Sequence, residues 1–350
     1  MLPDLGKARP AFMEKVVYSN LGRTSRAMLV GPRKGQDNAV ISLGGTRVMI
    51  LTVDPISIIP TVGVRRSAWM SVHLVASDYA TSGLLPQYAT FSFNFPPKLS
   101  QKECELYVTA IGAECRELGV TVAAGHTGSY PGSDFTVIGA GSMFGFSKKG
   151  EFVDPSMARP GDAVLMTKEA GIETTASLAS SFPRWVEAKV GLRIASRARS
   201  LVAKCSTVAD SVAASRIGLG RNGVTSMHDA TEGGVIGGLS EMASASGTAF
   251  SILTSSVPVS PEVRAVCGAF GLDPLRSLSE GTLLITCNRG RVGELMEELL
   301  SVRIPVRMIG SVRRGEGLWT EDHNGKRTRL DVGADGYWKA YRSAAGRGLS

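Results

Sequence analysis

The sequence predicts an α+β fold in which mixed β-sheets are flanked by helices. Strand-like and helix-like segments alternate along both halves of the chain. Several strands follow one another through hairpins, as at Gly44-Gly45, which favours mixed sheets over a doubly wound parallel sheet. The 350 residues, 43% apolar and 20% charged, can build two domains with sizeable cores. We place the boundary just before the turn at Arg159-Pro-Gly-Asp162, which gives domains at 1–155 and 156–350.

The first half is expected to contain strands and two long helices. The segment from Val64 to Thr81 has helical periodicity and is apolar on most faces, so this helix should be buried. Ser100 is the expected cap of a second helix, which runs to about Glu117 and has Glu103 as its capping-box partner. Strands are expected at 27–30, 39–43, 47–53, 88–95, 120–124 and 135–144.

The second half repeats this style. A strand at 163–167 precedes helices within 172–218, and a β-type run begins at Asn222 and ends at His228. The remaining elements are expected in this order: a helix at 235–245, a strand at 249–253, a helix at 261–270, a strand at 282–287, a helix at 292–300, and closing strands near 305–320.

The octapeptide Met227-His-Asp-Ala-Thr-Glu-Gly-Gly234 joins the central strand to its helix. A strand that stops at a glycine-opened helix leaves backbone N–H groups pointing outward, and these groups and the helix dipole suit a phosphate. Asp229 beside them suits the metal that accompanies a polyphosphate. The same octapeptide is also typical of an aspartate helix cap followed by small-residue helix packing.

Three acids of the first half share this setting at the ends of elements. Asp37 opens a strand, Asp54 closes one, and Asp78 closes the buried helix. Each alone is typical of a turn or a cap. Carboxylates that converge repel one another unless a cation lies between them. Oxygen ligands without His or Cys spacing favour Mg²⁺ over zinc, so the joint pattern predicts a magnesium site.

Composition indicates which kind of partner the protein binds and in which compartment it is found. The formal net charge is +8, but lysine and arginine are scattered, which disfavours nucleic acid and fits an anionic small substrate. The five cysteines have no Cys-x-x-Cys spacing, which indicates reduced thiols in a cytoplasmic protein. The N-terminus lacks a signal-peptide core, and no apolar run approaches the roughly 18 residues of a membrane helix. His73 lies mid-helix among apolar residues and is expected to be a core histidine.

An ordered set of motifs carries a resemblance to a known family. The motifs, in chain order, are Gly-x-Asp-Asn-Ala-Val-Ile, Val-Asp-Pro, Ala-Ser-Asp-Tyr-Ala, Ala-Gly-His-Thr, Met-His-Asp-Ala-Thr-Glu-Gly-Gly and Leu-Ser-Glu-Gly-Thr-Leu-Leu-Ile. Over about residues 5–320 the chain resembles the aminoimidazole ribonucleotide (AIR) synthase superfamily. Within it, the chain is most similar to the hydrogenase-maturation HypE proteins and to archaeal AIR-synthase-related proteins.

The resemblance implies a PurM-like fold of two α/β domains. It also implies a dimer whose N-terminal sheets pair, with ATP and Mg²⁺ between the domains. By motif match, the Mg²⁺ ligands would be Asp37, Asp54, Asp78 and Asp229. The ATP-binding residues would be Asp37, Asn38, Gly125, His126, Thr127, Thr231, Gly233, Gly234, Glu280 and Gly281.

The sequence departs from the family pattern at several positions. The usual Asn-Asp is Ser77-Asp78, and His126 stands where the family has an acid, so this residue is either a phosphate contact or base or a bystander. HypE proteins end in a cysteine that carries the carbamoyl group, whereas this sequence ends in Gly-Leu-Ser, which predicts no such reaction in cis. Selenophosphate synthetase belongs to the same superfamily and has a Cys and a Lys in its N-terminal loop; Lys7 is the only candidate for that lysine in this sequence. The catalytic candidates are therefore Asp229, His126 and Lys7.

The resemblance implies an ATP- and Mg²⁺-dependent enzyme. It would phosphorylate an oxygen of an unidentified substrate, or dehydrate the substrate through a phosphorylated intermediate. The alternative is a HypE-like nucleotide-binding maturation or regulatory protein without turnover. Expected partners are a second copy of the chain, a small-molecule or protein-borne phosphoryl acceptor and a maturation protein. A nucleic-acid role is a third and less favoured alternative.

Overall fold

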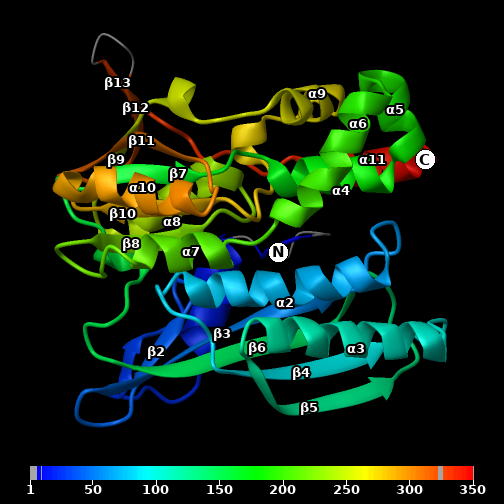
Figure 1. Ribbon diagram of the computed structural model, residues 1–350, viewed down its shortest axis with the longest axis horizontal. Helices are drawn as coiled ribbons and strands as arrows, with labels where there is room; N and C mark the ends of the chain where they lie inside the picture. The colour runs from blue at the N-terminus through cyan, green and yellow to red at the C-terminus, as the bar shows by residue number, and fades with distance from the viewer. Residues whose placement is uncertain (1–5, 9, 322–325, 350) are drawn as a thin grey trace.

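Two mixed β-sheets, each with helices packed against it, confirm the α+β class. The structure, a computed structural model, describes residues 6–8, 10–321 and 326–349. The first half of the chain forms the lower part of Figure 1 and the second half the upper part. Within the described ranges, no helix combines the length and the apolarity needed to span a bilayer.

The N-terminal sheet has six strands in the order β1-β2-β3-β6-β4-β5. Only the β4–β5 pair is parallel; the other pairs are antiparallel. The strands are β1 (Met28–Val30), β2 (Ala39–Ser42), β3 (Arg47–Ser57), β4 (Tyr88–Phe95), β5 (Thr121–Ser129) and β6 (Val137–Lys148). A short helix, α1 (Pro10–Phe12), and the one-turn segments η1 (Met13–Val17) and η2 (Tyr18–Asn20) precede them.

Helices α2 (Val64–Ala80) and α3 (Gln101–Glu117) cover one face of this sheet (Figure 1). Strand β4 explains why, since alternate residues from Ala89 to Phe95 are buried against both helices. The capping box at the start of α3 is confirmed, because Ser100 and Glu103 exchange hydrogen bonds. In Figure 1, α2 lies between this sheet and the C-terminal half.

The opposite face of the N-terminal sheet carries no helix among the described residues (Figure 1). It presents apolar side chains to solvent, including Val53, which is 63% exposed, and Phe146, which is 37% exposed. Tyr88 and Phe144 stack across the β4–β6 pair on this face. Contiguous exposed apolar surface of this kind marks an interaction site in soluble proteins.

The C-terminal sheet has seven strands in the order β13-β12-β9-β11-β7-β10-β8. They are β7 (Ala163–Thr167), β8 (Val224–Asp229), β9 (Ala249–Ile252), β10 (Leu283–Cys287), β11 (Val306–Arg313), β12 (Gly317–Glu321) and β13 (Arg327–Arg329). Helix α8 (Gly234–Ser246) packs on one face, and α7 (Val208–Ser215) and α10 (Val292–Ser301) pack on the other. Along β7, Val164 faces α8 while Leu165 faces α7 and α10, which is the alternation of a strand buried on both sides.

A helical cluster extends the C-terminal half beside this sheet. It contains α4 (Ile172–Ser181), α5 (Pro183–Val190), α6 (Leu192–Ser200), α9 (Pro261–Ala269) and α11 (Tyr337–Gly346). Helix α11 was not expected from the sequence. Its buried Tyr337 and Ala344 seat it on the apolar cluster around Phe182 and Leu178.

The largest difference from the expected elements is β5. The segment Gly125-His126-Thr127-Gly128 was expected to follow a strand, but β5 continues through it to Ser129. The reason is parallel pairing with β4, in which Gly125 lies opposite Phe91 and Thr127 opposite Phe93. Pairing to a long neighbour thus overrides the local preference of glycine for turns.

His73 on α2 is a largely enclosed histidine with a hydrogen-bond partner. Its Nδ1 lies 3.0 Å from Ser206 Oγ and its ring stacks on Trp69. Glu114, 3.6 Å from Nε2, would favour the charged ring, but burial dominates and lowers the pKa of His73 to about 4. The neutral ring therefore belongs to the folded state.

This pKa predicts an acid-sensitive part of the stability. Because the folded-state pKa lies below the unfolded value near 6.5, the stabilisation is complete above pH 6.5 and is lost as the pH falls towards 4. Between pH 7 and 4.5 the wild type should lose about 2 kcal/mol more unfolding free energy than His73→Gln, from about 1.4 kcal/mol per pKa unit. Urea unfolding at both pH values measures this difference. Equal losses in the two proteins would contradict it.

Candidate active site

His228 joins the two halves of the chain at the end of β8. Its Nδ1 lies 2.8 Å from Asp37, just before β2, and its Nε2 lies 3.1 Å from Glu241 on α8. Burial lowers the pKa of His228, but the two carboxylates outweigh burial and raise it well above 6.5. The ring is therefore held as a cation between two acids, and it fixes Asp37 against β8. His228 belongs to the Met227–Gly234 motif, but the sequence pattern alone predicts no role for it.

Asp229, the last residue of β8, is the most enclosed acid of the site. Its side chain is 1% exposed, and neither carboxylate oxygen has a hydrogen-bond partner among the described residues. One ligand atom each of Asp37, His228 and Asp229 lies within 4.8 Å of the other two. Burial, followed by Asp37, raises the pKa of Asp229 to about 7. A buried carboxylate with both oxygens free is costly unless a cation satisfies it.

Asp54 and Asp78 belong to the same electrostatic cluster. Burial, Glu232 and Asp229 raise the pKa of Asp54 to about 7. Burial, Asp229, Asp54 and Asp37 raise the pKa of Asp78 well above its usual value. Asp54 lies on β3 and Asp78 near the end of α2, so the acids anticipated from separate motifs influence one another in the fold.

Two further acids, Glu173 and Glu280, complete the cluster, and only Glu280 was expected from the sequence. Burial and Glu232 raise the pKa of Glu173, at the start of α4, to about 8. Glu280, which was anticipated, is 9% exposed, and burial and Asp229 raise its pKa. One carboxylate oxygen each of Glu173 and Glu280 has no partner among the described residues. The sequence signal that could have identified Glu173 is its position in the first turn of α4, two residues after Gly171.

Lys7 lies beside these acids. Desolvation lowers its pKa, but Glu241, Glu232, Asp37 and Asp78 outweigh that effect and raise it. The side chain keeps an exposed part, so this lysine stands at the rim of the cluster. Its ammonium group can form charge-assisted hydrogen bonds to a phosphate.

Asn38 and Thr52 form hydrogen bonds around Asp37 and Asp78. Its Nδ2 donates to Asp78 O at 2.7 Å and to Thr81 Oγ1 at 2.9 Å, which ties the start of β2 to the end of α2. Thr52 Oγ1 donates to Asp37 O at 2.9 Å and lies 3.3 Å from Asp78 Oδ2. Asn38 was expected to contact ATP. Its side-chain amide instead donates to the end of α2, next to Asp78.

The glycine-opened start of α8 differs from the expectation. The N–H of Gly233 donates to Asp335 Oδ2 at 2.9 Å, and the N–H of Gly234 donates to Thr231 O at 3.0 Å. A Cβ on Gly234 would lie 2.6 Å from Ser277 O, so this glycine is required by close backbone packing. The N–H groups expected to face a phosphate thus have partners within the chain.

Gly125, His126 and Thr127 lie apart from the acids in the single chain. Asp54 on β3 pairs with Gly141, which pairs with Phe91, which pairs with Gly125 on the sheet edge. Three strand spacings separate Asp54 from Gly125, roughly 14 Å at about 4.8 Å each. His126 is exposed, and its Nε2 lies 2.5 Å from the Tyr130 hydroxyl. Strand β5 is thus an edge strand of the N-terminal sheet, three strands from Asp54, and the triphosphate contact expected of these residues stays a prediction.

Gly281, an expected cofactor contact, has a structural constraint of its own. Its φ is +95°, and an added Cβ would lie 2.0 Å from Lys204 O. The half-buried Lys168 Nζ donates to Gly281 O at 2.9 Å and to Asp210 Oδ2 at 2.8 Å. Lys168 thereby holds the turn that carries Glu280.

Gly281→Ala should consequently destabilise the fold. The positive φ and the backbone clash together should lower the unfolding free energy by about 2–3 kcal/mol. The matched control is Gly268→Ala in α9, where nothing lies within 4 Å of the new Cβ and alanine should stabilise by up to about 1 kcal/mol. Thermal and urea unfolding compare the two variants, and an equally stable Gly281→Ala would refute the packing account.

The donor set defines the chemistry of the site. Oxygen ligands predominate, with one histidine whose two nitrogens are both engaged by carboxylates. Such a set fits a hard divalent cation such as Mg²⁺ better than zinc. The free oxygens of Asp229 are the atoms such a cation would satisfy.

The chain is similar to proteins of known families. Residues 35–146 match the N-terminal domain, and residues 159–320 the C-terminal domain, of the AIR synthase related proteins. The carbamoyl dehydratase HypE of Rhizobium leguminosarum bv. viciae is 29% identical over 268 residues, covering 72% of this chain and 69% of that protein. A putative hydrogenase expression/formation protein of Methanocaldococcus jannaschii is 25% identical over 298 residues, covering 84% of each.

Solved structures share the fold across nearly the whole chain. A crystal structure of a HypE–HypF complex aligns with a TM-score of 0.71 at 21% identity, covering 92% of this chain and 99% of that chain. A structure of ThiL, a thiamine monophosphate kinase, complexed with AMPPCP and TMP aligns with a TM-score of 0.69 at 20% identity, covering 91% and 94%. Because the two family domains match in order and together span most of the chain, the chain belongs to the AIR synthase-related family.

Proposed function

We propose that this protein is an ATP- and Mg²⁺-dependent enzyme that transfers the γ-phosphoryl group of ATP to an oxygen of its substrate. The phosphorylated product is either released or loses phosphate in a dehydration. The observation that carries the proposal is the buried Asp229, with both oxygens unpartnered, beside Asp37 at the meeting of the two halves. Membership of the family and the nucleotide analogue in the ThiL structure support the same reading.

The residues of the cluster would bind the metal ions, position the metal ligands and bind the phosphates. Asp37, Asp54, Asp78 and Asp229 would hold the magnesium ions, which neutralise the charge of the transferred phosphoryl group when bound. His228 and Asn38 position Asp37 and Asp78 through the hydrogen bonds described above. Lys7 would bring a permanent positive charge to the phosphates from the rim.

The substrate class is proposed from the relatives. HypE of R. leguminosarum is named as a carbamoyl dehydratase, which favours a carbamoyl oxygen as the acceptor for this chain as well. The HypE–HypF complex likewise favours a maturation protein as a partner. A homodimer joined through the open face of the N-terminal sheet completes the proposed assembly.

A second candidate is nucleotide binding without turnover. Asp335 favours it, because its carboxylate occupies the Gly233 N–H at the start of α8. A phosphate would have to displace this carboxylate or bind elsewhere on the cluster. Under this alternative the protein would act as a HypE-like maturation or regulatory partner.

The formation of ADP separates the two candidates. Purified protein is incubated with ATP and Mg²⁺, with a peptide bearing an S-carbamoylated cysteine, and with thiamine monophosphate as the comparison acceptor. ADP formation that depends on the carbamoylated peptide supports the dehydratase reading. Tight Mg-ATP binding with no ADP formed under any condition supports binding without turnover, and no binding at millimolar Mg-ATP would refute both.

A further inference from the structure

A second charged region lies at the other end of the C-terminal sheet. Two adjoining lobes of a surface cavity, of about 340 and 580 Å³, are lined where β7 and β8 begin and where β10 and β11 end. Strand β8 runs from Val224, beside the cavity, to Asp229 at the acid cluster. At about 3.3 Å per residue, this strand separates the two regions by roughly 17 Å.

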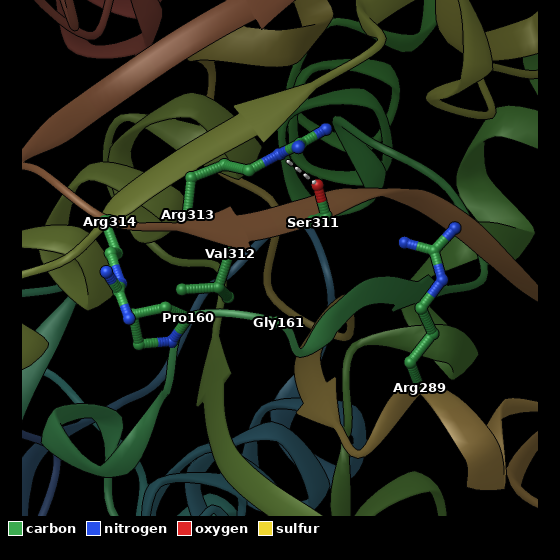
Figure 2. Close-up of a pocket in the computed structure, with 7 residues that line it drawn as sticks. All are labelled: Pro160, Gly161, Arg289, Ser311, Val312, Arg313 and Arg314. Atoms are coloured by element: carbon green, nitrogen blue, oxygen red, sulfur yellow. Dashed lines mark hydrogen bonds between the residues drawn. The ribbon is translucent and has the colours of Figure 1, made fainter.

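Arginines dominate the lining of this cavity. They are Arg159, Arg221, Arg289, Arg313 and Arg314. Figure 2 shows Arg314 and Arg289 on opposite sides of Gly161, with Arg313 turned towards Ser311. The segments that supply them are far apart in the sequence, so the fold, rather than a basic run, assembles the charge.

Most of these guanidinium groups have no ion-pair partner in the part of the chain that the structure describes. Arg313 lies 3.8 Å from Glu321 and donates to Ser311 Oγ at 3.0 Å. For the other four, no carboxylate of the described residues lies within ion-pair distance. The single acid of the lining is Asp162, whose Oδ2 is already used by the Arg159 N–H and by Thr225 Oγ1. Like charges gathered around a concave surface are unfavourable without an anion.

The shape and lining of the cavity narrow the class of anion. Its volume is that of a small-molecule site. The lining contains no aromatic side chain, so a single-stranded nucleic acid would find no stacking platform. Guanidinium forks match phosphate oxygens in geometry, and several forks around one cavity suit an ion with several phosphate groups.

We propose that this arginine-lined cavity binds a polyphosphate, either free or as the phosphate chain of a nucleotide, at a site separate from the acid cluster. The ligand would bridge Arg289 and Arg314 across the Pro160-Gly161 turn. The turn is part of the connection between the two sheets, since β6 ends at Lys148 and β7 begins at Ala163. Polyphosphate bound here would therefore also order this connection.

Calorimetric titration with sodium tripolyphosphate tests the proposal. The titration is run at about 0.15 M salt, where surface charges are largely screened, and without divalent cation, so that the acid cluster does not recruit phosphate. Arg289→Ala/Arg314→Ala should weaken binding by at least about ten-fold, since charge-assisted contacts to phosphate are strong. Arg193→Ala/Arg264→Ala, which removes two exposed arginines elsewhere in the same half, is the matched control and should bind as the wild type does. ADP and ATP as further titrants distinguish a free polyphosphate from a nucleotide.

Each other outcome overturns the proposal. Equal weakening in both double variants would show only a general charge effect. No binding of tripolyphosphate, ADP or ATP by the wild type would exclude the site. A hexaglutamate peptide or an oligoribonucleotide that binds the cavity arginines when the phosphates do not would assign the surface to a macromolecule instead. Circular dichroism confirms that the variants are folded. These titrations do not depend on whether the proposed phosphoryl transfer occurs.

Discussion

Asp229→Asn should abolish Mg²⁺-dependent nucleotide binding and lower any ATP turnover by at least about 100-fold, which corresponds to about 2.7 kcal/mol of transition-state stabilisation. The amide keeps the shape of the side chain but removes the buried charge opposite Asp37 that would hold the cation. In the wild type, Mg-ATP should raise the melting temperature with occupancy. In the variant, this rise should disappear.

The same substitution should stabilise the protein without ligand. The pKa of Asp229 is raised to about 7, above its unfolded value near 3.9, so its charge costs stability increasingly as the pH rises from 4 to 7. The variant should therefore melt higher than the wild type at pH 8, with a smaller gain at pH 5. Asp134→Asn, which removes an exposed charge, is the control and should retain the Mg-ATP response. A variant that melts lower at pH 8 and still responds to Mg-ATP would contradict this account of the site.

Val53→Glu should convert a homodimer into a monomer. Val53 is 63% exposed on the open face of the N-terminal sheet, so the substitution should cost a single chain little. In a two-fold dimer the change occurs twice and places two charges in an apolar interface, which should weaken association by at least about 100-fold. Light scattering on the eluted protein measures the mass at micromolar concentration.

The matched control lies on the covered side of the same sheet. Val108 is 40% exposed on the outer surface of α3, so Val108→Glu adds the same charge to the same half without touching the open face. It should leave the mass at two chains. A wild type that elutes with the mass of one chain, or a Val108→Glu variant that dissociates equally, would refute the proposed interface.

The fold could be predicted from the sequence where local signals were strong. The strand 88–95 and the strand 163–167 match their expected bounds, because alternating or fully apolar runs define them without help from the rest of the chain. Helix α11 escaped prediction because the apolar cluster around Phe182, distant in sequence, stabilises it. Strand β5 was cut short because its pairing with β4 is equally distant information.

The site residues also fall into two groups: those predictable from a local motif and those that depend on tertiary contacts. Asp37, Asp54, Asp78 and Asp229 could be named because each stands in a recognisable motif at an expected element boundary. In the structure, β3 continues past Asp54 to Ser57, and α2 continues past Asp78 to Ala80. Asp229, Asp54 and Asp37 raise the pKa of Asp78, and Asp37 raises the pKa of Asp229, so these carboxylates influence one another in the fold. The partners of His228 and the contact of Asp335 with Gly233 could not be named, since both are tertiary contacts without a local pattern. His126 illustrates the converse, because its motif position placed it near the phosphates while the sheet order puts it on the far edge.

Manganese provides the most direct measurement of the central claim, that these acids hold a divalent cation with ATP. Crystals grown with Mn²⁺ and AMPPCP would reveal each metal by its anomalous scattering, independently of any turnover. We expect a peak within about 2.0–2.4 Å of carboxylate oxygens of both Asp229 and Asp37, the range of hard divalent cations and oxygen ligands. Nucleotide bound without metal between these two side chains, or manganese bound only at other positions, would contradict the account.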